Sequence, residues 1–146
     1  MTSDKNNILY DTSLIYFLDD EKIDELKDLA LKHPLKRSRV CLHRSEQSLV
    51  HEMVIVAHSS SYLEPHQHPK NKPESYHVLE GELKVKIFDD DGNVIKEKKL
   101  YANKHPRMYR IQGQVWHQPI PQSEWVVYHE VATGPFVKAE DVIYMK

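Results

Sequence analysis

The sequence predicts a mainly β fold, a sandwich or barrel of short strands preceded by one short helix. Its 146 residues, 40% apolar and 29% charged, fit a single domain with one core. Leu83, Val85 and Ile87 alternate with lysines, which is the period of a strand with one buried face. Further short apolar segments follow between turn residues, and this repetition is typical of sandwiches and barrels.

The helix is predicted over residues 20–32. Asp19 and Asp20 can cap its N-terminus, and Pro34 ends it. Apolar side chains at helical spacing share one face: Ile23, Leu26 and Ala30. We therefore expect residues 1–36 to form a helical extension that packs on the barrel as a brace or lid.

The β domain is predicted over residues 37–146, with strands starting near residue 40. The Asp-Asp-Asp-Gly-Asn run at 89–93 predicts a hairpin turn. The lysine-rich run 96–99 lacks aromatic partners, so it is interpreted as a solvated strand face rather than a nucleic-acid site. The expected strands cover 49–57, 76–79, 83–88, 94–100, 109–111, 115–118 and 125–132.

Composition excludes several classes of function. Lysine plus arginine (20) nearly balance aspartate plus glutamate (22), so no global field attracts nucleic acid or an acidic membrane. No apolar stretch approaches the roughly 20 residues of a membrane span, and the polar N-terminus does not resemble a signal peptide. With a lone cysteine, Cys41, the sequence predicts a protein of the reducing cytoplasm.

Histidine is abundant, with 10 residues, and two of them are informative by position. His66 and His68 point to the same side of an extended strand, so both imidazoles can reach one metal ion. Glu74 and the distant His117 add a carboxylate and a third imidazole. This mixed nitrogen and oxygen donor set suits a divalent transition metal and leaves coordination positions for water or substrate.

These residues carry a resemblance. Pro65-His66-Gln67-His68, followed by Glu74 and Gly81, is similar to the first motif of the cupin superfamily, and Gly113 with Trp116-His117 resembles the second. Over residues 37–137 the chain resembles the WbuC family of cupin-fold metalloproteins. Six ordered blocks carry that similarity: 53–58, 61–68, 74–81, 89–92, 116–117 and 129–136.

The resemblance implies a cupin-type barrel, a double-stranded β-helix or jelly roll. It implies one divalent metal ion (Zn, Fe, Mn or Ni) bound by His66, His68, Glu74 and His117 inside the barrel mouth. It also implies an association with bacterial surface-polysaccharide metabolism and a homodimer. The spacing from His68 to Glu74 is one residue longer than usual, so Glu74 is either a ligand or an outer acceptor or general base beside the metal.

Other side chains are candidates for catalysis or substrate binding. Glu74 and His77 are the candidate proton carriers, although on a regular strand His77 points away from the barrel when Glu74 points in. On the last strand either His129 or Glu130 must face inward, and His129 is the candidate for substrate binding. The further candidates for binding substrate are an anion clamp, Arg37, Arg39 and His43, and the aromatic residues Tyr76, Tyr109 and Trp116.

The sequence does not settle whether the protein is an enzyme. The first hypothesis is a metal-dependent isomerase or epimerase acting on a sugar-derived metabolite, with a dioxygenase as a variant. The second is a non-catalytic sugar-binding or sensing cupin with a structural metal. The third is a metal-free epimerase with a histidine base. All three predict a small carbohydrate-derived ligand and no nucleic acid.

Overall fold

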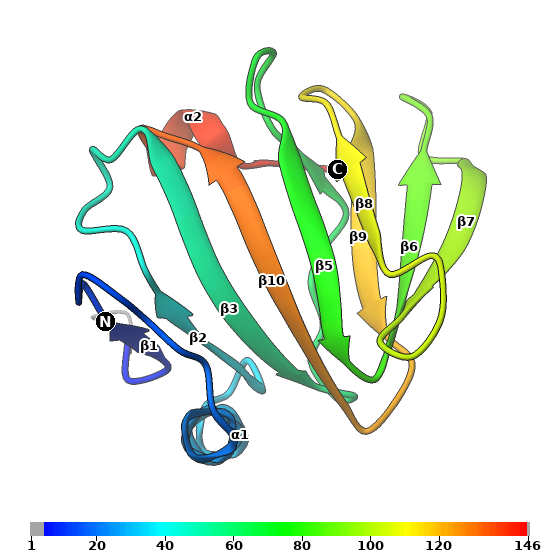
Figure 1. Ribbon diagram of the computed structural model, residues 1–146. Coiled ribbons are helices and arrows are strands. Elements are labelled where there is room, and N and C mark those ends of the chain that lie inside the picture. The colour runs from blue at the N-terminus through cyan, green and yellow to red at the C-terminus, as the bar shows by residue number, and fades with distance from the viewer. Residues whose placement is uncertain (1–4, 146) are drawn as a thin grey trace.

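Two β-sheets face each other in a computed structural model that describes residues 5–145 (Figure 1). The six-stranded sheet has the order β1-β2-β3-β10-β5-β8, and the five-stranded sheet has the order β11-β4-β9-β6-β7. All neighbours are antiparallel except β1 and β2. The strands are β1 (Ile8–Tyr10), β2 (Arg37–Cys41), β3 (Val50–His58), β4 (His66–Gln67), β5 (Glu74–Glu80), β6 (Glu82–Phe88), β7 (Val94–Tyr101), β8 (Met108–Ile111), β9 (Trp116–Pro121), β10 (Trp125–Thr133) and β11 (Ile143–Tyr144).

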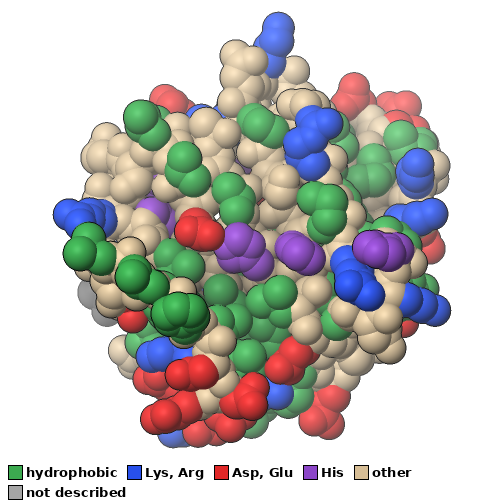
Figure 2. All heavy atoms as spheres, viewed as in Figure 1, with side chains coloured by type: hydrophobic (Ala, Val, Ile, Leu, Met, Phe, Trp, Pro, Cys, Tyr) green, Lys and Arg blue, Asp and Glu red, His purple; other side chains and the backbone are tan. Residues whose placement is uncertain are grey.

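Helix α1 (Asp20–Lys32) confirms the predicted helix. The side chain of Asp19 accepts a hydrogen bond from the Lys22 amide as the N-cap. The predicted apolar face is buried on the outer side of the six-stranded sheet, against valines of β2, β3 and β10. Its other face is acidic and exposed, and acidic side chains gather around α1 in Figure 2. The helix is therefore a brace on the sheet.

The main core lies between the two sheets. It joins inward-facing side chains of both, among them Met53, Tyr76, Leu83, Leu100 and Tyr128. Strict alternation along β5 buries positions 74, 76 and 78 and turns 77 and 79 outward. The predicted jelly-roll barrel of the cupin type is confirmed by this two-sheet topology and by the structural comparisons reported below.

Some elements differ from the expectations. The strands of the β domain were predicted to start near residue 40, but β2 already includes Arg37 and Arg39. Arginine at two of the five positions hides the apolar period of this strand. Strand β1, within the predicted helical extension, pairs with β2, and a second short helix, α2 (Lys138–Asp141), precedes β11. Over residues 5–145, neither helix has the length and apolar character that a membrane crossing requires.

Gly81 joins β5 to β6 with a φ of +80°, and a Cβ there would lie 2.3 Å from the carbonyl oxygen of Trp125. Gly81→Ala is therefore expected to lower the free energy of unfolding by about 3 kcal/mol in urea denaturation, through backbone strain plus steric overlap. Gly92→Ala is the control, because its φ is +87° but its Cβ would meet only the Met145 sulfur at 3.7 Å. A loss of about 1 kcal/mol is expected there. Equal losses of unfolding free energy in the two variants would contradict a steric contribution at Gly81.

Candidate metal centre

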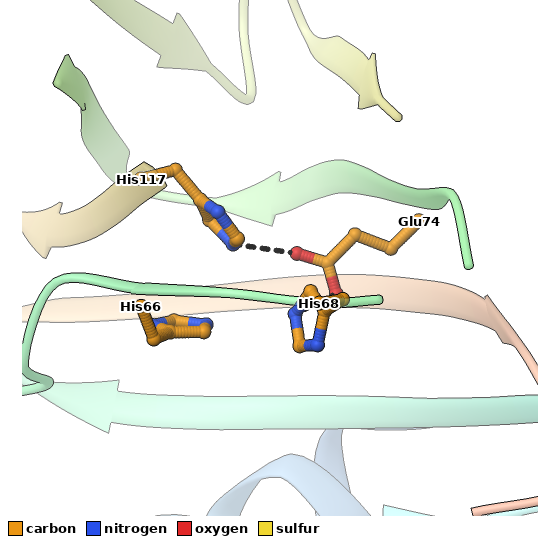
Figure 3. A group of neighbouring side chains, drawn as sticks. All are labelled: His66, His68, Glu74 and His117. Carbon is orange, nitrogen blue, oxygen red and sulfur yellow. Dashed lines mark ion pairs between the residues drawn. The ribbon is translucent and has the colours of Figure 1, made fainter. Parts of the chain in front are cut away.

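The four predicted ligands converge inside the barrel. His66 begins β4, His68 follows it, Glu74 begins β5 and His117 lies in β9. One ligand atom of each lies within 4.8 Å of those of the others (Figure 3). His66 and His117 are paired across β4 and β9, whereas Glu74 reaches in from the opposite sheet. Because the two sheets pack face to face, residues that are far apart in the sequence lie close together here.

The cluster is nearly sealed. His117 is fully buried, and His66 and Glu74 are each 5% exposed. His68 is the least buried of the four, with 17% of its side chain exposed. Solvent or a small ligand therefore approaches the cluster most readily on the side of His68.

Hydrogen bonds to backbone carbonyls fix the three imidazole rings. The Nδ1 atom of His66 lies 2.8 Å from the Glu64 oxygen, and that of His117 lies 2.9 Å from the Val115 oxygen. The Nδ1 atom of His68 lies 2.7 Å from the Asp141 oxygen. A carbonyl oxygen only accepts, so each Nδ1 must carry the hydrogen. When the ring is neutral, as in a metal-bound histidine, each Nε2 then presents its lone pair to the centre of the cluster.

The contacts inside the cluster call for a cation. Glu74 Oε1 lies 2.8 Å from His117 Nε2, and Glu74 Oε2 lies 3.2 Å from His68 Nε2. These distances are short, yet Glu74 Oε1 and both Nε2 atoms are buried without an aligned hydrogen bond. Lone pairs held this close repel one another unless a positive charge sits between them. Three imidazoles and one carboxylate fit a divalent transition metal, and these four residues would hold it.

The pKa values also indicate that the cluster favours a positive charge beside Glu74. Burial alone would raise the pKa of Glu74, but His117 and His68 hold it well below its ordinary range. Burial opposes a charge on His68, yet the Glu74 carboxylate raises its pKa to about 8. Burial and the neighbouring His117 lower the pKa of His66 to about 4. The metal-free cluster therefore keeps an ionised carboxylate beside a histidine that favours a proton.

Glu130 is a polar residue of the inner wall that the sequence analysis did not choose. It pairs with Tyr76 across β10 and β5, so both side chains face the barrel interior. It is partly reachable by solvent but deeply set, and its pKa is raised to about 8 by burial and the Glu74 charge. Arg39, His68 and the Tyr76 hydroxyl act in the opposite direction. An inward carboxyl group thus lies next to the candidate metal ligands.

The register decides between His129 and Glu130. Val126, Val127 and Tyr128 are all buried, so hydrophobicity does not show which face of β10 is inward. His129 pairs with His77 across β5, and both lie on the outer face of the six-stranded sheet, where histidine side chains are visible in Figure 2. There His129 Nε2 lies 2.7 Å from Glu52 Oε2. The structure therefore brings neither His77 nor His129 to the cluster.

The predicted aromatic residues divide between the two sides of the barrel wall. Tyr76 and Tyr109 face inward, with ring centroids 5.1 Å apart, and the Tyr109 hydroxyl is buried without a hydrogen-bond partner. Trp116 precedes an inward histidine and points the other way, where its Nε1 donates to Asp90 at 3.0 Å. Tyr76 and Tyr109 lie near the cluster, and Trp116 does not.

Of the predicted anion clamp, Arg39 lies near enough to His43 for its charge to act on that ring, and Arg37 has contacts of its own. Arg37 lies at the end of β2 farthest from the cluster in register and donates to the Tyr62 carbonyl oxygen at 3.1 Å. Arg39 is exposed on the inward side of β2, where its charge acts on Glu130. His43 stacks on His51, with ring centroids 4.0 Å apart, and His51 lies two strands from Glu74 in register. Arg39 faces the interior beside Glu130, and a substrate role for any of the three residues stays a prediction.

The comparisons with known proteins give a family and a fold. A family model described as "Domain of unknown function (DUF6016)" matches residues 18–100. No curated protein matches the chain. The capsular polysaccharide assembling protein CapF from Staphylococcus aureus is similar in structure, with a TM-score of 0.63 and 14% identity. The match covers 75% of this chain and 30% of CapF, and one CapF structure contains the inhibitor 3-isopropenyl-tropolone.

Two further solved structures are similar. The Shewanella oneidensis protein SO0799 has a TM-score of 0.60 and 10% identity, and the match covers 77% of this chain and 75% of that protein. Oxalate decarboxylase from Lactobacillus farciminis, solved as a formate complex, has a TM-score of 0.52 and 17% identity over 67% of this chain and 27% of that enzyme. CapF and oxalate decarboxylase are cupins, so the chain has a cupin-type fold. At these identities the similarity shows the fold alone.

Proposed function

This chain belongs to the family described as Domain of unknown function (DUF6016), and from that premise we propose that it is a metal-binding cupin acting on a sugar-derived metabolite. Its site would hold one divalent metal ion through His66, His68, Glu74 and His117. The convergence of three oriented imidazoles and one carboxylate in a nearly sealed site carries the proposal.

The residues around the cluster have separable tasks. A bound divalent metal supplies a Lewis acid that polarises an oxygen of the ligand. Glu130 offers a carboxyl group on the inner wall beside it, and Tyr109 offers a hydroxyl without a partner. Hydroxyl and carboxyl groups pair with the hydroxyls of a sugar. Many of the other inward side chains belong to the apolar core, which limits the access of bulk water to the cluster.

The proposed setting is bacterial surface-polysaccharide metabolism. The resemblance of residues 37–137 to the WbuC family supports it, and so does the structural similarity to CapF, whose name describes capsular polysaccharide assembly. The chain spans about 30% of the length of CapF, so the similarity concerns one part of that protein. An isomerase or epimerase is the reaction class we favour for this setting.

The proposal is tested by elemental analysis of untagged protein after reconstitution with Zn, Fe, Mn or Ni. We expect about one metal ion per chain in the wild type and almost none in His66→Ala/His117→Ala, since two of four ligands are lost. His58→Ala/His105→Ala is the control, because it removes the same number of imidazoles outside the cluster. A wild type without metal, or a His66→Ala/His117→Ala variant that keeps it, would overturn the proposal.

A second candidate function, a sugar-binding cupin with a structural metal, is favoured by the burial of three of the four ligands. Tropolones chelate divalent metals through two adjacent oxygens, so tropolone reports on open coordination positions. Its addition to cobalt-loaded protein would change the visible spectrum if two positions are open. An unchanged spectrum would indicate a closed, structural site.

A further inference from the structure

The C-terminal strap, which we define as residues 134–145, returns from the end of β10 to the metal centre. It contains α2 and β11, and β11 pairs with β4, placing Tyr144 opposite His66. The amide of Met145 donates to the carbonyl oxygen of Pro65 at 3.0 Å. The strap therefore adds one of the two edge strands of the five-stranded sheet, beside β4, which begins with His66.

The strap also orients one of the ligands. His66 and His117 donate to carbonyl oxygens two residues upstream, so each ring is held by its own segment. His68 instead uses the carbonyl oxygen of Asp141, 73 residues away, at 2.7 Å. That contact requires the hydrogen on Nδ1 and leaves the Nε2 lone pair facing the cluster. The orientation of His68 thus depends on a distant segment.

Asp141 has a second set of contacts that holds its carbonyl in place. Its side chain is buried, and Oδ2 accepts from the amide of Val137 at 2.6 Å and from Lys72 Nζ at 3.2 Å. Lys72 also donates to the carbonyl oxygen of Pro135. Lys72 lies in the loop 69–73 that separates His68 from Glu74, where the spacing is one residue longer than the cupin motif. Lys72 therefore joins this loop to the strap at two points, before α2 and at its last residue.

We infer that the C-terminal strap is a positioning element of the metal centre, with Asp141 and Lys72 as its positioning residues. The inference rests on the proposed metal binding. A docked strap fixes the tautomer and direction of His68, and a bound metal in turn holds the ring that donates to the strap. By linkage, metal binding and strap docking stabilise each other by the same factor.

The test compares Asp141→Ala with Glu140→Ala, a neighbouring exposed carboxylate that gives the same change of charge. Zinc affinity is measured by competition with a chelator. Asp141→Ala keeps the backbone carbonyl that accepts from His68 but removes the side-chain contacts that hold it, so we expect it to weaken binding by about 10-fold and Glu140→Ala to leave binding unchanged. Lys72→Met is a second variant that loosens the loop without altering the strap, and a weakening of about 10-fold is expected.

Two readouts separate positioning from general stability. In the metal-free proteins at a pH well above 8, where the His68 ring is neutral, its nitrogen NMR shifts report its tautomer. We expect Asp141→Ala, but not Glu140→Ala, to raise the Nε2-protonated form. In the wild type, zinc should slow hydrogen exchange at the Met145 amide, and His68→Ala should abolish that protection. The inference would be overturned if Asp141→Ala and Lys72→Met both bind zinc with wild-type affinity. It would also be overturned if zinc does not change hydrogen exchange at the Met145 amide. A wild type that binds no zinc would instead refute the proposed function.

Discussion

Glu74→Gln is expected to weaken divalent metal binding by more than about 100-fold and to leave the barrel folded. Glutamine keeps the shape of the side chain but removes its charge and one oxygen donor. Loss of an outer partner costs about 10-fold to 100-fold, so a loss above that range marks a direct ligand. The measurement is a chelator competition with zinc. This outcome would decide between the two roles that the motif spacing left open for Glu74.

The same variant has a second consequence in the metal-free protein. The Glu74 carboxylate raises the pKa of His68 to about 8 against the opposing effect of burial. Once the carboxylate is gone, the pKa of His68 should fall below its ordinary value of 6.5, and an NMR titration measures this. Glu52→Gln is the control, because Glu52 pairs with His129 on the outer face. A weakening of zinc binding by about 10-fold to 100-fold would instead show that Glu74 is an outer acceptor or base, and wild-type affinity would show that it has neither role.

Much of the candidate site could be predicted from local patterns. The histidines at 66 and 68 share a side of one extended segment, and alternation along β5 explains why Glu74 and Tyr76 face inward and His77 does not. The helix over 20–32 was recognisable because its cap and its apolar face agree. Each of these inferences needs only neighbours within a few residues, which is the range over which a period is visible.

The rest depends on pairing between distant segments. His129 and Glu130 could be assigned to a face only from the register of β10 against β5, because apolar residues precede them on both faces. The role of Asp141 is a backbone contact made by its carbonyl oxygen, and such a contact has no side-chain signature. Strands β1, β4 and β11 have two or three residues each, too few to show a period.

Glu130→Gln is expected to stabilise the metal-free protein at high pH. In the folded state the pKa of Glu130 is raised from 4.5 to about 8 by burial and by the charge of Glu74. Between these two values the folded chain holds a proton that the unfolded chain releases. The stability that this group contributes is therefore complete below about pH 4.5 and is lost as the pH rises through about 8. Glutamine resembles the protonated acid and has no proton to lose.

The two proteins should therefore have similar melting temperatures near pH 4.5, whereas near pH 9 the variant should be more stable by about 2 kcal/mol, or about 5 °C. This figure is smaller than the full pKa shift implies, because solvent partly reaches Glu130. Glu124→Gln, an exposed change of the same chemistry, should show no such pH dependence. Zinc should shrink the difference, since a cation beside Glu74 offsets the charge that raises the pKa. A gain independent of pH would contradict this coupling and would leave Glu130 without an electrostatic link to the metal centre.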